Sequence, residues 1–139
     1  MKKQAELWMQ YAEEDLQTIG EIIDNENLTK IVAFHAQQCV EKSFKAILEL
    51  YDLQIPRVHD LRKLLGKMKE LTIQLEVEDE RLDELNQIYL DTRYPSDFGT
   101  LPNGTPSNQK AESFNDFAES VYQQVKKIID DFRDDSRNE

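Results

Sequence analysis

Glycine, proline, cysteine and histidine are all scarce in this chain of 139 residues, and each shortage narrows the choice of structure. With only four glycines and four prolines, few positions interrupt a helix, so a mainly helical fold is expected. The single cysteine, Cys39, cannot form an internal disulfide and fits the reducing cytoplasm. The two histidines, His35 and His59, lie on separate segments outside any HExxH-type pattern, so we expect no metal site.

Long apolar runs and an excess of positive charge are missing too. No run approaches the roughly 18 to 20 residues that cross a bilayer. The opening MKKQAELWMQ lacks the apolar stretch of a signal peptide. The formal net charge of −11 repels nucleic-acid backbones and anionic membranes. We therefore expect no membrane partner and no extended DNA-binding surface, and any nucleotide contact must come from a local basic patch.

Helical periodicity of the apolar residues is the main pattern that is present, and no segment shows sustained strand alternation. The pattern predicts helices at about 3–25, 29–53, 59–75, 78–93 and 108–133. Because most links are short, neighbouring helices are expected to be antiparallel. We predict an all-α, up-and-down bundle of four long helices and one shorter helix in a single domain over 1–139. A long loop is expected at about 95–107, and a frayed tail at about 134–139.

The second predicted helix has an unusual polar face within FHAQQCVEKSFKAIL, residues 34–48. At about 100° per residue, His35, Gln38 and Lys42 share one face, and Lys45 lies on its flank. Such a set is suited to binding a phosphate or the edge of a base. The alternative is an ordinary solvated face, on which Glu41 and Lys45 form an i,i+4 pair that contributes about 0.2–0.5 kcal/mol.

Two further residues near this face have a structural and a functional interpretation. Asp15 lies beside Leu16 on the buried flank of the first helix, so we expect it to pair with His35, Lys42 or Arg93. The pair is either a structural ion pair or a means of orienting a functional base. Cys39 follows His35 by one helical turn, but mid-helix cysteine without an oxyanion turn is more typical of a buried apolar side chain than of a nucleophile.

Helix ends supply the remaining candidates. In the stretch DTRYPSD, Arg93 either stabilises a helix C-terminus or binds a phosphate, and Tyr94 is expected to be extended because Pro95 follows it. His59 and Asp60 are expected to cap the third helix by accepting hydrogen bonds from its backbone amides.

Four stretches carry a resemblance to a known family. They are the first helix with Trp8, Ala12, Asp15 and Leu16, FHAQQCVEKSFKAIL from Phe34, HDLRKLL from His59, and YLDTRYPSD from Tyr89. Together they resemble the HEPN domain family (higher eukaryotes and prokaryotes nucleotide-binding). The resemblance implies a small helical bundle, often dimeric and often encoded beside a minimal nucleotidyltransferase. One branch of the family consists of metal-independent RNases, frequently toxins, whose signature is an arginine followed four to six residues later by a histidine.

This chain departs from the RNase signature, because no histidine occurs after His59. The resemblance therefore implies a non-catalytic protein that binds a nucleotide or similar anionic ligand, pairs with a nucleotidyltransferase, or does both. The alternatives are a HEPN ribonuclease toxin of a toxin–antitoxin module and a purely structural dimeric scaffold. A homodimer is expected, with a nucleotide as ligand and no other cofactor. The expected ligand-binding residues are His35, Gln38, Lys42, Lys45, Arg93 and Tyr94, with Asp15 in an orienting role.

In that site each residue type has a distinct task. Lys42 and Arg93 would hold phosphate, Tyr94 would stack a base, and Gln38 would recognise an amide or ring edge. Asp15 would orient His35 or Arg93. The structural alternative is that the same residues form a buried polar network that fixes helix register and a dimer seam.

Overall fold

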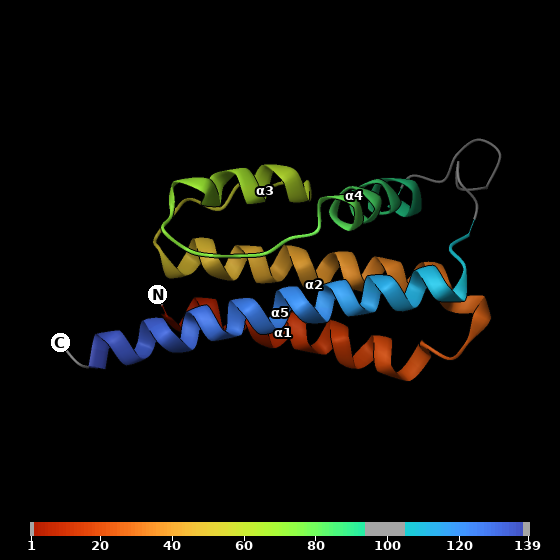
Figure 1. Ribbon diagram of the computed structural model, residues 1–139, viewed down its shortest axis with the longest axis horizontal. Coiled ribbons are helices and arrows are strands. Elements are labelled where there is room, and N and C mark those ends of the chain that lie inside the picture. Colours follow the sequence, from red (N-terminus) through yellow and green to blue (C-terminus); the bar gives the residue numbers. More distant parts are fainter. Residues whose placement is uncertain (1, 94–104, 138–139) are drawn as a thin grey trace.

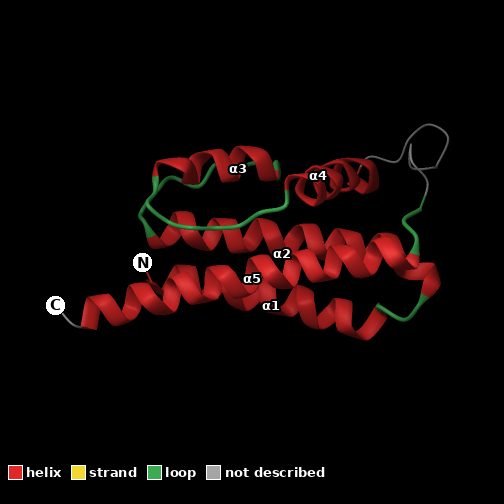
Figure 2. Ribbon diagram, viewed as in Figure 1, coloured by secondary structure: helices red, strands yellow, loops and turns green. Residues whose placement is uncertain are grey.

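Five α-helices fill most of the computed structural model, which describes residues 2–93 and 105–137, with side chains described for 3–89 and 105–132 (Figure 1). They are α1 (Lys2–Ile22), α2 (Thr29–Leu50), α3 (Leu61–Lys67), α4 (Asp79–Arg93) and α5 (Asn108–Arg137). Two 3-10 turns, η1 (Glu26–Leu28) and η2 (Met68–Glu70), precede α2 and follow α3. Since the described ranges contain helices and no strand, the predicted all-α fold class is confirmed (Figure 2).

The second helix, α2, lies at the centre of the molecule. α1 and α5 run alongside it, whereas α3 and α4 lie on its opposite side (Figure 1). All four of the other helices contact α2. Its residues Ala33, Ala36, Val40, Phe44 and Ile47 are completely buried, because a helix surrounded by others is apolar around most of its circumference. Any polar side chain on α2 therefore lies close to a second element.

The end of α2 is set by a left-handed residue rather than by proline. The helix stops at Leu50, three residues before the predicted end, and Asp52 has a φ of 57°. The backbone N–H of Asp52 donates to the Glu49 carbonyl, and that of Leu53 donates to the Leu48 carbonyl at 2.8 Å. This pair of bonds is the Schellman arrangement, which satisfies carbonyls that the helix leaves without donors.

The third helix is shorter than predicted, and this is the main correction to the expected fold. Instead of running over 59–75, α3 ends at Lys67, and after η2 the backbone of Leu71 is extended. From there Leu71, Ile73, Leu75 and Val77 are partly buried against the core, while the residues between them are exposed. That alternation of period two is a strand-like signal, and the helical prediction for this stretch overlooked it.

The other predicted boundaries differ by a few residues. α1 ends at Ile22, and α5 continues to Arg137, beyond the predicted end at 133. Residues 94–104, which make up most of the predicted loop, lie outside the described residues. Along the helices that are described, none combines the length and apolar character needed to cross a bilayer.

Candidate functional site

One buried carboxylate joins α1 to α2. Asp15 Oδ1 lies 2.8 Å from His35 Nδ1, and Asp15 Oδ2 accepts a hydrogen bond from Lys42 Nζ at 2.7 Å. The Asp15 side chain is 8% exposed, whereas those of His35 and Lys42 are 25% and 22% exposed. The predicted pairing of Asp15 with His35 or Lys42 is confirmed, and Asp15 contacts both. The third predicted partner, Arg93, lies among the side chains that are not described.

Helix geometry explains why one carboxylate reaches two donors. His35 and Lys42 are seven residues apart on α2, which is two helical turns, so both project from the same face toward α1. Because the carboxylate accepts a hydrogen bond from Nδ1, a neutral His35 carries its proton on Nδ1 and presents Nε2 as an acceptor. The Nε2 atom has no hydrogen-bond partner in the described part of the chain. Asp15 therefore fixes both the orientation and the tautomer of the ring.

A second buried carboxylate, that of Glu41 on α2, contacts nitrogen atoms of three other side chains. Its oxygens lie 3.2 Å from Gln37 Nε2, 2.9 Å from His59 Nδ1 and 3.1 Å from Lys45 Nζ. Glu41 is 3% exposed, Lys45 8% and Gln37 0%. The interpretation of Glu41 and Lys45 as a solvated surface pair is therefore wrong. The pair exists, but the segment that carries His59 packs over it, and the Lys45 ammonium lies 5.4 Å from the centre of the Trp8 ring.

This second network includes residues that the sequence analysis did not select. Gln37 also donates to the His59 carbonyl at 3.1 Å and accepts from Gln38 Nε2 at 2.8 Å. His59 does not cap α3. Asp60 accepts from the amides of Arg62 and Lys63, which confirms Asp60 as the cap, while the amide of Leu61 donates to Asn86 Oδ1. The sequence does contain a signal for this network: Gln37, Glu41 and Lys45 are spaced four residues apart, so they share one face of α2.

An aromatic cluster connects this network to α4. The ring of Tyr89 lies 4.9 Å from that of His59 and 6.1 Å from that of Phe34, with the Phe34 and Tyr89 planes 13° apart. Arg93, the last residue of α4, follows Tyr89 by one helical turn. The fold thus brings the last turn of α4, which ends with the arginine of the RYP stretch, to the side of α2 where Phe34 lies. Tyr94 is outside the described residues.

Cys39 and His35 do not form a reactive pair. Cys39 is fully buried, its thiol points to the Ala118 carbonyl on α5 at 3.9 Å, and burial raises the pKa of the thiol far above its ordinary value. This position agrees with the interpretation of Cys39 as a small apolar side chain. Within residues 3–89 and 105–132, no group of histidine, cysteine and carboxylate side chains is arranged to hold a metal ion.

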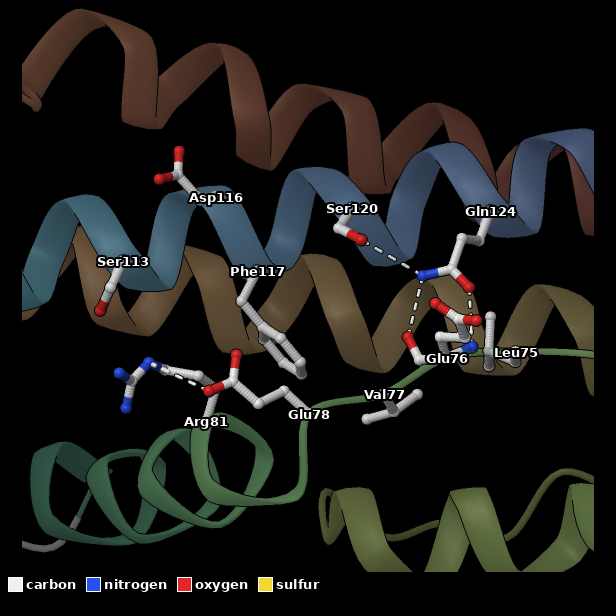
Figure 3. A pocket seen from close by; sticks show the side chains of 10 residues that line it. All are labelled: Leu75, Glu76, Val77, Glu78, Arg81, Ser113, Asp116, Phe117, Ser120 and Gln124. Carbon is white, nitrogen blue, oxygen red and sulfur yellow. Dashed lines mark hydrogen bonds and ion pairs between the residues drawn. The ribbon is translucent and has the colours of Figure 1, made fainter.

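A separate groove lies between α5 and the extended segment that precedes α4 (Figure 3). Its volume is about 860 Å³, and Phe117 from α5 reaches toward Val77 and Glu78 across it. The side-chain amide of Gln124 closes one end by donating to the Glu76 carbonyl at 2.9 Å and accepting from the Glu76 N–H at 2.7 Å. None of the residues predicted to bind a ligand lines this groove.

The two networks on α2 differ from the rest of the chain in their charge. The negative charges of Asp15 and Glu41 are balanced by the positive charges of Lys42 and Lys45. With neutral histidines the two networks together therefore have no net charge, whereas the whole protein has a net charge of −11. Protonation of either histidine makes the set cationic. The arrangement is therefore able to hold an anionic group by hydrogen bonds from partly exposed donors, whereas the acidic remainder of the surface repels one.

Comparisons with known proteins point to one family. The HEPN domain model matches residues 5–128. A protein of Methanocaldococcus jannaschii, MJ1304, which is named provisionally as a toxin, is 28% identical over 140 residues, covering 91% of this chain and 89% of that protein. Two solved structures are similar in fold. ST0689, an archaeal HEPN homologue, has a TM-score of 0.68 at 21% identity and covers 91% of this chain and 98% of its own.

The second structure, TT1696 from Thermus thermophilus, has a TM-score of 0.69 at 24% identity and covers 89% of this chain and 97% of its own. At such identities the two structures show the fold alone. The match begins within α1 and ends within α5, and it includes α2, α3 and α4 completely together with both carboxylate networks. This chain belongs to the HEPN domain family.

Proposed function

We propose that this HEPN protein binds a nucleotide or a similar anionic ligand on the face shared by α1 and α2, without catalysing a reaction. The observation that carries the proposal is that the Asp15 carboxylate contacts both His35 Nδ1 and Lys42 Nζ. It places an oriented imidazole and an ammonium group side by side at one partly exposed place. Lys42 would contact phosphate, His35 would donate or accept through Nε2, and Gln38 would bind the edge of a base.

Three further residues complete the proposed ligand-binding set: Lys45, Arg93 and Tyr94. The Lys45 ammonium lies beside Glu41 and the Trp8 ring, so its part is to keep this side of α2 from becoming acidic. The helical position of Arg93, one turn after Tyr89, supports a role for it at the same side of α2. The position of Tyr94 directly after α4 is consistent with the same proposal.

A toxin ribonuclease is the competing function, and the resemblance to MJ1304 is the observation in its favour. Against it stands the sequence, in which no histidine follows His59. Incubation of the purified protein with a fluorescently labelled RNA separates the two. Cleavage that persists in the presence of a metal chelator and is lost in the Arg93→Ala variant would favour the ribonuclease.

A partner protein on the same face is compatible with ligand binding. Tyr11 and Ile31 are 47% and 40% exposed, and they are the large hydrophobic side chains that the described part of the chain leaves exposed. Tyr11 precedes Asp15 by one turn of α1, and Ile31 precedes His35 by one turn of α2. This surface would suit a second copy of the chain or a nucleotidyltransferase. Light scattering reports the first directly, since a dimer has twice the mass of 16.3 kDa.

The test of the proposed function is isothermal titration with ATP, GTP and UTP, with and without magnesium. We expect affinities in the micromolar range that weaken at least about tenfold in Lys42→Met and in Arg93→Ala, because each removes a phosphate contact. Lys63→Met is the matched control, because Lys63 is an exposed lysine on α3 and is not among the side chains that contact Asp15 or Glu41 in the described part of the chain. The proposal fails if no nucleotide gives heat, or if the control weakens binding as much as Lys42→Met.

A further inference from the structure

His59 presents a fixed aromatic ring that is half exposed. Its side chain is 49% accessible to solvent although the ring packs against Tyr89 at 4.9 Å with a tilt of 32°. Nδ1 lies 2.9 Å from Glu41, and the His59 carbonyl accepts from Gln37 at 3.1 Å. One part of the ring is therefore covered by Tyr89 and one edge is bound to Glu41, while much of the remaining surface is open.

The groups that hold this ring are themselves buried and well connected. Glu41 has a side-chain exposure of 4% and is fixed from a second side by Lys45. Tyr89 is 4% exposed and contacts Phe34 in addition to His59. A ring held in this way loses little freedom when a ligand packs on it, because its orientation is set before the ligand arrives.

His59 is also linked to the proposed ligand-binding face. Gln38 donates to Gln37, and Gln37 donates to the His59 carbonyl, so a continuous chain of amides joins the two places. Gln38 is the residue proposed to recognise the edge of a base. Tyr89, on which the His59 ring packs, lies one helical turn before Arg93. A nucleotide whose phosphates reach the cations of the site would thus have an aromatic surface within the same region.

We infer that the exposed surface of the His59 ring is the platform on which the base of the bound nucleotide stacks, an inference that rests on the proposed function. Imidazole rings stack with bases in the same way as other aromatic side chains. The ligand class is therefore a purine nucleoside phosphate, since a purine offers the larger stacking surface, and free polyphosphate is a weaker ligand. This assigns to His59 the task that the sequence suggested for Tyr94. The structural alternative is that His59 only fastens residues 53–60 to α2.

Two substitutions separate the ring from its hydrogen bond. The amide nitrogen of His59→Asn stands near the position of Nδ1 and keeps the bond to Glu41 but removes the ring, whereas His59→Phe keeps the ring and removes the donor. Each variant and the wild type are titrated with ATP and with inorganic tripolyphosphate. We expect His59→Asn to weaken ATP binding about tenfold and leave tripolyphosphate unchanged, while His59→Phe retains ATP binding.

The outcomes distinguish this inference from the proposed function. If tripolyphosphate binds wild type as tightly as ATP, the anion site stands and the stacking platform is wrong. Equal weakening of ATP binding in both variants, together with a lower melting temperature, would make His59 structural. If neither ligand binds wild type, the proposed function fails and the inference fails with it.

A second measurement follows ligand binding to the wild-type protein and uses a variant only to assign signals. The chain has only two histidines, so the proton spectrum contains two sets of imidazole signals, which His59→Asn assigns. A base stacked on His59 shifts its ring protons upfield by the ring current of the purine. We expect that shift with ATP and not with tripolyphosphate. The same small shift with both ligands would exclude stacking.

Discussion

Two charge networks of similar geometry occur in opposite environments. On the α1–α2 face, Asp15 binds His35 and Lys42, and its side chain is 8% exposed. Between α3 and α4, Arg62 binds Asp79 and Asp83, with a guanidinium side chain that is 42% exposed and carboxylates that are 74% and 59% exposed. In each network one charged group bridges two partners of opposite or titratable charge, and the contacts of the central group are 2.7–2.9 Å long.

The two networks differ in their exposure to solvent, and this exposure determines which of them contributes more to the free energy of unfolding. Exposed ion pairs are screened by water and salt and gain little over their separated, hydrated charges. A buried charge has already lost its hydration, so removing one partner leaves the other without compensation. The guanidinium of Arg62 has the better geometry, with two parallel bonds to Asp83, yet the Asp15 network should dominate the free energy of unfolding.

Removal of the buried carboxylate should have the largest effect. Asp15→Ala leaves Lys42 and His35 without their acceptor, and we expect the free energy of unfolding to fall by about 3 kcal/mol, measured by urea denaturation. Glu14→Ala, which replaces the neighbouring exposed carboxylate on α1, is the control and should change stability by less than about 0.5 kcal/mol. Similar losses in both variants would show that the burial of Asp15 does not account for its effect on stability.

Removal of one partner should have an intermediate effect. Lys42→Met keeps most of the aliphatic stem and leaves Asp15 its contact with His35, so we expect a loss of about 2 kcal/mol. Because the residues act as a unit, the double variant of Asp15→Ala and Lys42→Met should be little less stable than Asp15→Ala alone. Additive losses in this double-mutant cycle would contradict a shared network.

The exposed network should have the smallest effect and a dependence on salt and pH. Arg62 holds the pKa of Asp83 below its ordinary value of 3.8. A carboxyl with a lowered pKa stabilises the fold above its unfolded pKa, and this contribution disappears as the pH falls through the folded pKa. Arg62→Met should therefore lower the urea midpoint only slightly at neutral pH and low salt, and this small loss should disappear at high salt or as the pH falls through the folded pKa of Asp83. A large shift that survives 1 M sodium chloride, roughly the concentration at which the screening length is 3 Å, would break the comparison.

The residues of the α1–α2 face were predictable because they depend on one helix and its immediate neighbour. Helical spacing puts His35 and Lys42 on one side of α2, and the desolvation cost of a carboxylate on a buried flank requires Asp15 to find a cation. The burial of Glu41 and Lys45 was not predictable in this way. An i,i+4 pair has the same spacing whether it is solvated or covered, and the side chains that contact this pair, His59 and Trp8, come from other elements.

The extended stretch shows a different limit. Residues 71–77 carry an alternating pattern, but the apolar residues Leu61, Leu64, Leu65, Met68 and Leu71 have helical spacing and favour a continuing helix. Packing against the core favours the extended conformation, because an extended segment connects α3 to α4 while partly burying Ile73, Leu75 and Val77. Local propensity is weak at such a place, and tertiary contacts override it.

The helical fold, the family resemblance and the pairing of Asp15 with the polar face of α2 could all be inferred from the amino-acid order, because helical period and desolvation act over short distances. Three features depend on the packed fold: Glu41 is buried and bound by His59, the His59 ring packs on Tyr89, and α3 ends early. Each of these depends on which side chains from distant parts of the chain meet at one place, and the cost of burying a charge is fixed there rather than by its neighbours in sequence.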